Sequence, residues 1–151
     1  MKRLLSGISA LAVAAASLAA PAYACTRTLY VGDGNLVLAG RNTDWKENMS
    51  SNLWVLPAGM KRNGAAGPQS AEWSSKYGSV VVSGYEAGST DGRNEKGLAA
   101  NRLYLAESQY PTPVQGKPFL SLSPWLQYAL GNFATVAEAS SPSRFRRSRA
   151  S

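Results

Sequence analysis

The only cysteine of the chain, Cys25, directly follows a segment with the layout of a secretory signal. A thiol is intrinsically nucleophilic, and a free α-amino group titrates near neutral pH. Cleavage before Cys25 would therefore join a nucleophile and a base in one residue, because the exposed amine can take the thiol proton and return it to a leaving amine. The chemistry that this permits is acyl transfer through a thioester. A buried or lipid-modified cysteine is the alternative interpretation.

The chain contains no histidine. This absence excludes a Ser-His-Asp triad, a Cys-His pair and imidazole metal ligands. A single cysteine also excludes an internal disulfide and a Cys-x-x-Cys site. The sequence therefore predicts no metal and no cofactor. It leaves the α-amino group of Cys25 as the most natural base for the thiol.

A second polar cluster follows at residues 41–45. Asp44 can hold the Cys25 amine as ammonium or fix its orientation, and Arg41 can favour the thiolate or bind a carboxylate. The alternative is a surface ion pair of little energetic value. Trp45 would ordinarily be a core aromatic residue.

A third cluster, residues 91–98, has the sequence Asp-Gly-Arg-Asn-Glu-Lys-Gly-Leu. Taken alone, it predicts a tight turn that leads into a strand. In order and spacing, the three clusters together resemble the choloylglycine hydrolase family, which includes bile salt hydrolases and penicillin V acylases. The exported Gram-negative branch of penicillin V acylases is most similar in the combination of four segments: the Cys-Thr-Arg start and residues 52–54, 59–62 and 74–78.

The resemblance implies an α+β chain with the N-terminal nucleophile (Ntn) hydrolase fold, an αββα four-layer sandwich. It implies hydrolysis of a linear amide C–N bond in a small molecule, such as penicillin V, an acyl-homoserine lactone or a bile salt amide. Cys25 would be the nucleophile, with Arg41 and Asp44 beside it, and Trp45 would line the acyl pocket.

Two further residues acquire roles from the resemblance. Asn94 belongs to the structural motif of the third cluster, and Tyr104 lies ten residues after it. The family places an oxyanion-hole group at that position, and an aromatic residue there favours the acylases over the bile salt hydrolases. Without the resemblance, Tyr104 would be interpreted as a strand core residue. Family members are often homotetramers.

The resemblance covers residues 25–139, whereas the family chain is much longer. Its second half brings an Asn that completes the oxyanion hole and an Arg near the nucleophile, and no residue here matches either. We therefore expect an incomplete fold and a truncated, inactive copy of an acylase. Residues 140–151 form an unrelated basic tail. An interaction tail is one interpretation, and the abrupt change of composition inside a helix signal favours a truncation or frameshift.

Residues 1–24 have the three parts of a signal peptide. Lys2 and Arg3 precede an apolar stretch, and Ala22 and Ala24 occupy the positions that a signal peptidase reads. The sequence thus predicts export to the periplasm. A signal anchor and a lipoprotein signal are the alternatives, and the second would attach the protein to the membrane through lipid on Cys25.

The net charge of +7 comes mainly from the two ends of the chain. Six of the sixteen basic residues lie in the signal segment and the tail, which leaves ten against nine acidic residues in the body. A nearly neutral body does not favour a nucleic-acid partner.

Patterns of apolar and turn-forming residues predict strands followed by helices, the order of an α+β chain. Ser123 and Thr135 are the expected N-caps of two helices, with Pro124 at the first helical position of the first. The expected strands are 26–31, 36–39, 52–56, a pair 73–77 and 79–85, and 98–106, with turns or loops at 32–35, 58–70 and 86–96.

Three interpretations from different classes follow. The first is an amide hydrolase of the acylase type, and the second is a non-catalytic exported binding protein or lipoprotein. The third is a fragment without function.

Overall fold

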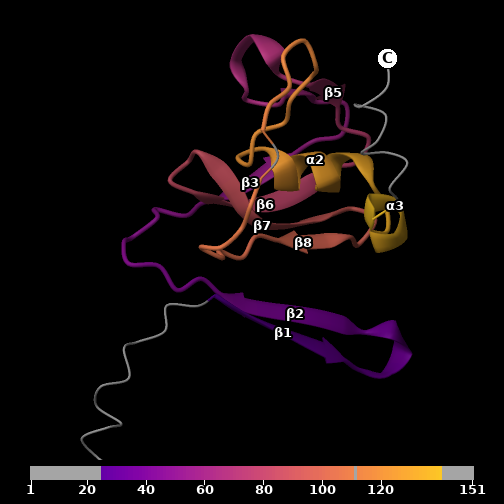
Figure 1. Ribbon diagram of the computed structural model, residues 1–151. Coiled ribbons are helices and arrows are strands. Elements are labelled where there is room, and N and C mark those ends of the chain that lie inside the picture. The colour runs from indigo at the N-terminus through magenta and orange to yellow at the C-terminus, as the bar shows by residue number, and fades with distance from the viewer. Residues whose placement is uncertain (1–24, 111, 141–151) are drawn as a thin grey trace, which may run out of the picture. The chain divides into compact units, whose positions relative to one another are not determined.

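The structure is a computed structural model that describes residues 25–110 and 112–140 (Figure 1). The described chain divides into two compact units between Lys46 and Glu47. The predicted signal segment and almost all of the predicted basic tail lie outside the described residues. None of the described helices is long and apolar enough to cross a membrane.

The first unit is a β-hairpin of strands β1 (Thr26–Val31) and β2 (Val37–Asn42). The strands are antiparallel, with Thr26 opposite Asn42. A short 3-10 turn (Asp33–Asn35) joins them, and Gly34 adopts a positive φ of 65° there, which glycine accepts without steric cost. The predicted turn is confirmed. The second strand runs three residues beyond its predicted end and therefore contains Arg41.

The second unit is built on a four-stranded antiparallel sheet in the order β3-β6-β7-β8. Its strands are β3 (Leu53–Leu56), β6 (Ser79–Gly84), β7 (Gly88–Asn94) and β8 (Ala99–Asn101). A separate hairpin pairs β4 (Lys61–Asn63) with β5 (Glu72–Ser74), and a 3-10 turn (Gly67–Gln69) lies between them. The helices are α2 (Trp125–Asn132) and α3 (Val136–Ser140).

Helix α2 packs across one face of this sheet (Figure 1). Leu126 and Leu130 are buried beneath it, together with Val81, Leu98 and Phe133. Gly92 of β7 lies directly under the helix, where a Cβ atom would stand 2.7 Å from Leu130 Cδ1. Only glycine at this position allows the helix to approach the sheet so closely.

Two predictions about the strands are wrong: one concerns which strands pair, and the other concerns a segment predicted as a turn. The predicted strands 73–77 and 79–85 do not pair with each other: β5 pairs with β4, and β6 lies between β3 and β7. The predicted polar turn 86–96 contains β7, an interior strand of the sheet. It contains glycine and polar residues and no large apolar side chain, so apolar alternation could not reveal it, but its backbone is bonded on both sides.

Smaller corrections concern the ends of elements. The predicted loop 58–70 contains β4, and the predicted strand 98–106 ends at Asn101. Helix α2 starts one residue later than predicted, because Pro124 occupies the cap position and Ser123 donates its hydroxyl to the carbonyl of Ala87. The predicted cap of α3 is confirmed, since the Glu138 N–H donates to Thr135 Oγ1 at 3.2 Å.

Asn94, at the end of β7, joins the β7–β8 turn to the end of helix α2. Its Nδ2 donates to the carbonyls of Leu130 and Phe133 at 2.8 and 2.7 Å. Its Oδ1 accepts the backbone N–H groups of Lys96 and Leu98 at 3.1 and 3.0 Å. The residue is only 3 % exposed. Every donor and acceptor position of the amide is therefore occupied.

Replacing Asn94 by Ala is expected to destabilise the fold strongly. The change leaves two carbonyls and two N–H groups without a hydrogen-bond partner around a buried position. We therefore expect a loss of about 2–4 kcal/mol in the free energy of unfolding. Urea titration followed by circular dichroism measures this. Asn101→Ala is the matched control, because its Nδ2 makes a single bond to Asp91. An equal loss in both variants would contradict the role of Asn94.

Candidate functional site

Cys25 lies immediately before β1 in the first unit. Its sulfur is a free thiol, and the residue is partly exposed. Because Thr26 pairs with Asn42 across the hairpin, the register places the residue after the cysteine opposite the end of β2. The hairpin thus brings Cys25 to the same end as the second polar cluster.

Asn42 connects that end of β1 to Asp44. The Thr26 N–H donates to Asn42 Oδ1 at 2.9 Å. Asn42 Nδ2 donates to both carboxylate oxygens of Asp44, at 3.1 and 3.2 Å. Arg41 Nε donates to the Asn42 carbonyl at 3.4 Å. Asn42 therefore fixes the Asp44 carboxylate relative to the backbone of the residue next to Cys25.

Sequence reasoning missed Asn42. Charge identifies Arg41 and Asp44 as candidates in the sequence, whereas the uncharged Asn42 between them receives no role there. The signal that could have found it is the hairpin register, because the turn at 32–35 sets Thr26 opposite Asn42.

The third cluster, residues 91–98, comprises the end of β7 and the turn that leads into β8. Gly97, with a φ of 87°, donates its N–H to the Asn94 carbonyl at 3.0 Å. Glu95 Oε1 accepts the Gly78 N–H at 3.0 Å, and Asp91 Oδ1 accepts a bond from Asn101 at 2.6 Å. The interpretation of this cluster as a turn is confirmed for residues 95–98 alone, because residues 91–94 belong to strand β7. Its polar side chains hold backbone and strands in place.

Tyr104 follows β8 in an irregular segment of the second unit, not in a strand. Its side chain is 67 % exposed. Cys25, Arg41, Asp44 and Trp45 all belong to the first unit. The pairing of Tyr104 with Cys25 across an oxyanion therefore stays a prediction.

Comparison with known proteins decides the family. The model of the linear amide C–N hydrolases, choloylglycine hydrolase family, matches residues 25–142. The chain belongs to this family. The resemblance drawn from its three clusters is thereby confirmed.

Two relatives of this choloylglycine hydrolase family member are informative. The chain is 48 % identical to a penicillin V acylase of Pectobacterium atrosepticum over 148 residues, which is 91 % of this chain and 39 % of the relative. The solved structure of penicillin V acylase from Agrobacterium tumefaciens matches with a TM-score of 0.72 at 55 % identity, over 75 % of this chain and 36 % of that one. The chain thus spans less than two fifths of the length of each relative.

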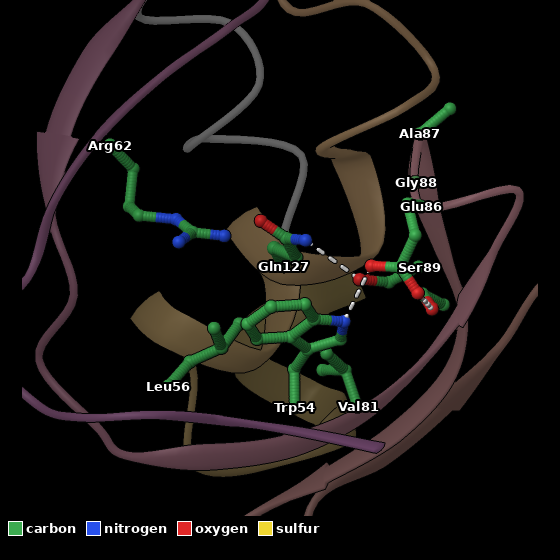
Figure 2. A pocket seen from close by; sticks show the side chains of 10 residues that line it. Trp54, Leu56, Arg62, Val81, Glu86, Ala87, Gly88, Ser89 and Gln127 are labelled. Carbon is green, nitrogen blue, oxygen red and sulfur yellow. Dashed lines mark hydrogen bonds between the residues drawn. The ribbon is translucent and has the colours of Figure 1, made fainter. Parts of the chain in front are cut away.

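A separate feature of this family member is a cavity of about 220 Å³ in the second unit (Figure 2). It lies between the sheet and helix α2, and both charged and apolar side chains line it. The lining residues are Trp54, Leu56, Arg62, Val81, Ser83, Glu86, Ala87, Gly88, Ser89 and Gln127.

Glu86 sits in the tight turn between β6 and β7. The Ala87 N–H donates to the Gly84 carbonyl at 3.0 Å, and the two central residues, Tyr85 and Glu86, have φ values of 56° and 53°. Two positive φ values define the type I′ turn that suits a twisted hairpin, yet residues with a Cβ adopt them at a cost. The turn therefore needs support from its surroundings.

The Glu86 carboxylate provides that support through three hydrogen bonds. Oε1 accepts bonds from Asn52 Nδ2 at 2.5 Å and Ser83 Oγ at 2.9 Å, and Oε2 accepts the indole N–H of Trp54 at 2.9 Å. These donors, chiefly Asn52 and Ser83, lower the pKa of the Glu86 carboxyl against a small opposing effect of burial. The carboxylate is thus held ionised at the wall of the cavity.

Arg62 of β4 is the cation of the same cavity. It is half-buried, and burial lowers the pKa of its guanidinium. One donor, Nη1, lies 3.0 Å from Met60 Sδ.

Among residues 25–110 and 112–140, no group of three or more histidine, cysteine or acidic side chains could hold a metal ion.

Replacing Glu86 by Gln is expected to lower the free energy of unfolding at neutral pH. It should also make that free energy less sensitive to acidification. Because the folded state depresses the pKa of Glu86, its contribution is present at neutral pH and is lost as the pH falls through the folded pKa. Urea unfolding at about pH 7 and about pH 3 measures both effects. The wild-type chain should lose more stability on acidification than Glu86→Gln.

The matched control is Glu72→Gln, which changes an exposed glutamate on β5. Its free energy of unfolding should equal that of the wild-type chain at both pH values. A Glu86→Gln variant as acid-sensitive as the wild type would show that the carboxylate does not stabilise the turn.

Proposed function

We propose that this chain carries the nucleophile-bearing part of a penicillin V acylase-like hydrolase of linear amides. The observation that supports this most directly is where the family match begins: it starts at Cys25, the residue that removal of a signal peptide would make N-terminal. The identity of about half of the matched residues to two penicillin V acylases supports the acylase class.

The proposed reaction uses Cys25 for both nucleophile and base. The α-amino group takes the thiol proton, the sulfur attacks the amide carbonyl, and the proton passes to the leaving amine as the C–N bond breaks. Water then hydrolyses the thioester and releases the acid. No cofactor takes part in this scheme.

Neighbouring residues would position these groups. Asp44, fixed through Asn42, would orient the ammonium form of the Cys25 amine. Arg41 would favour the thiolate, and Trp45 would contribute to the acyl pocket. Tyr104 would donate to the developing oxyanion, a contribution typically worth about 2.7–4 kcal/mol.

The proposal extends to the setting of the reaction. We infer export to the periplasm on the signal segment 1–24 and a place for both units in an αββα Ntn hydrolase fold. The solved relative, of which the chain covers 36 %, supports the fold. No residue of this sequence matches the second oxyanion Asn or the second Arg that the family resemblance implies, so the activity is tested together with a segment that supplies them.

Substitution of Cys25 tests the nucleophile in a complete protein. In a chimera, residues 25–142 of this chain replace the matching segment of the Pectobacterium acylase. We expect the chimera to hydrolyse penicillin V, and Cys25→Ser to reduce turnover to background, because a hydroxyl is a far weaker nucleophile than a thiol at neutral pH. Release of phenoxyacetate is the measurement.

Two controls separate thiol from amine. A chimera that retains Ala24 before Cys25 keeps the thiol but converts the amine to an amide, so it should lose turnover as well. Mass spectrometry of the exported chain shows whether Cys25 begins it or carries lipid. Full turnover of Cys25→Ser would overturn the nucleophile assignment, and lipid on Cys25 would favour the non-catalytic lipoprotein.

Tyr104→Phe tests the oxyanion donor in the same chimera. Loss of the hydroxyl should lower kcat by about 10²–10³-fold with little change in KM, because the donor acts on charge that develops in the transition state. Tyr110→Phe is the matched control, an exposed tyrosine outside the motif. Equal kcat values for the two variants would remove Tyr104 from the mechanism.

A further inference from the structure

The cavity beside helix α2 holds two opposite charges that do not satisfy each other. All its lining residues lie between Trp54 and Gln127, within the second unit. Figure 2 shows the guanidinium of Arg62 and the carboxylate of Glu86 on opposite sides of the Trp54 indole. They project from different elements, β4 and the β6–β7 turn.

Arg62 retains most of its hydrogen-bonding capacity. A guanidinium carries five N–H donors, and its described bond goes to a thioether, which is a weak acceptor. No carboxylate among the described residues lies within ion-pair distance of it. Partial burial removes part of the water around the guanidinium, and no carboxylate of the described residues replaces that water. An anionic partner from outside the chain would therefore bind it favourably.

Glu86 also retains capacity. A carboxylate offers about four acceptor positions, and three are used by Asn52, Ser83 and Trp54. The remaining position, beside the Trp54 indole, can accept a donor that carries positive charge. A ligand with negative charge alone would meet Arg62 favourably but would be repelled by Glu86, and a cation would face the reverse.

The floor between the two charges is apolar. Leu56, Val81 and the indole of Trp54 supply it. The amide of Gln127 is oriented by the bond from its Nε2 to Ser89 Oγ at 2.7 Å. The volume of about 220 Å³ is below the usual range of drug-sized sites, so the ligand must be small.

We propose that this cavity binds a small zwitterion of the ω-amino acid type. Its carboxylate pairs with Arg62, its ammonium with Glu86, and its methylene chain lies against Trp54 and Leu56. This ligand class satisfies both charges and the apolar floor at once. The inference is independent of the proposed amide hydrolysis, which requires Cys25.

Calorimetric titration of the purified chain tests the proposal with a series of probes. 4-Aminobutyrate, 5-aminopentanoate and 6-aminohexanoate vary the separation of the charges, while hexanoate and hexylamine each lack one charge. At least one zwitterion should bind saturably, and both single-charge probes should bind about tenfold more weakly or worse. Absence of saturable binding by every zwitterion, or equal binding of hexanoate, would overturn the proposal.

Variants assign the two charges. Arg62→Gln and Glu86→Gln should each weaken binding of the zwitterion by about tenfold or more. Lys61→Gln, beside Arg62 on β4, and Glu72→Gln, on β5, are exposed matched controls and should leave binding unchanged. Equal losses in the variants and controls would show that overall charge, not the cavity, governs binding.

Because Glu86→Gln is also expected to weaken the fold, a measurement on the unchanged chain accompanies it. In NMR spectra, zwitterion should shift the indole N–H signal of Trp54 and the side-chain amide of Gln127 in proportion to binding. The indole of Trp73 serves as the internal reference. It packs edge-on against Tyr128, with 5.1 Å between the ring centroids. Binding that leaves Trp54 unshifted, or shifts Trp73 equally, contradicts the placement.

Discussion

The fold of the second unit depends on one buried amide. The last carbonyls of an α-helix have no partner inside the helix, and burying them without one is costly. Asn94 satisfies two carbonyls at the end of α2 while it closes the β7–β8 turn through two backbone N–H groups. A single side chain thus fixes the register of a hairpin and the position of the helix over it. Gly92, two residues earlier, gives that helix the space to lie close.

This constraint explains why the third cluster has so specific a sequence. Its residues hold strands, turn and helix together: Asp91 binds Asn101, Glu95 binds the backbone of Gly78, and Gly97 adopts the positive φ that the turn needs. A motif that identifies a family of enzymes is here chiefly a folding motif. The segment that carries Tyr104 begins where this hairpin ends, so the motif sets where that segment starts.

The sequence predicted elements well where apolar side chains set the pattern and poorly where backbone pairing did. β1 matched its predicted limits because its own residues favour a strand and the segment that follows it favours a turn. β7 was missed because glycine and polar residues fill an interior strand, and only the pairing of both its edges makes it one. Cys25 and the family were accessible from motifs. The cavity was not, because Arg62 and Glu86 share no motif in the sequence and come to line one cavity only in the folded second unit.

Polar residues of this chain can be divided by how much of their hydrogen-bonding capacity the fold consumes. Asn94 has none left, so its role in the fold is structural. Asn42 spends its amide on Thr26 and Asp44, and so it orients the Asp44 carboxylate relative to the start of β1. Arg62 spends one donor on a thioether and bears the cost of partial burial without an ionic partner. A ligand with a negative charge would supply the ionic partner that the described residues do not give it.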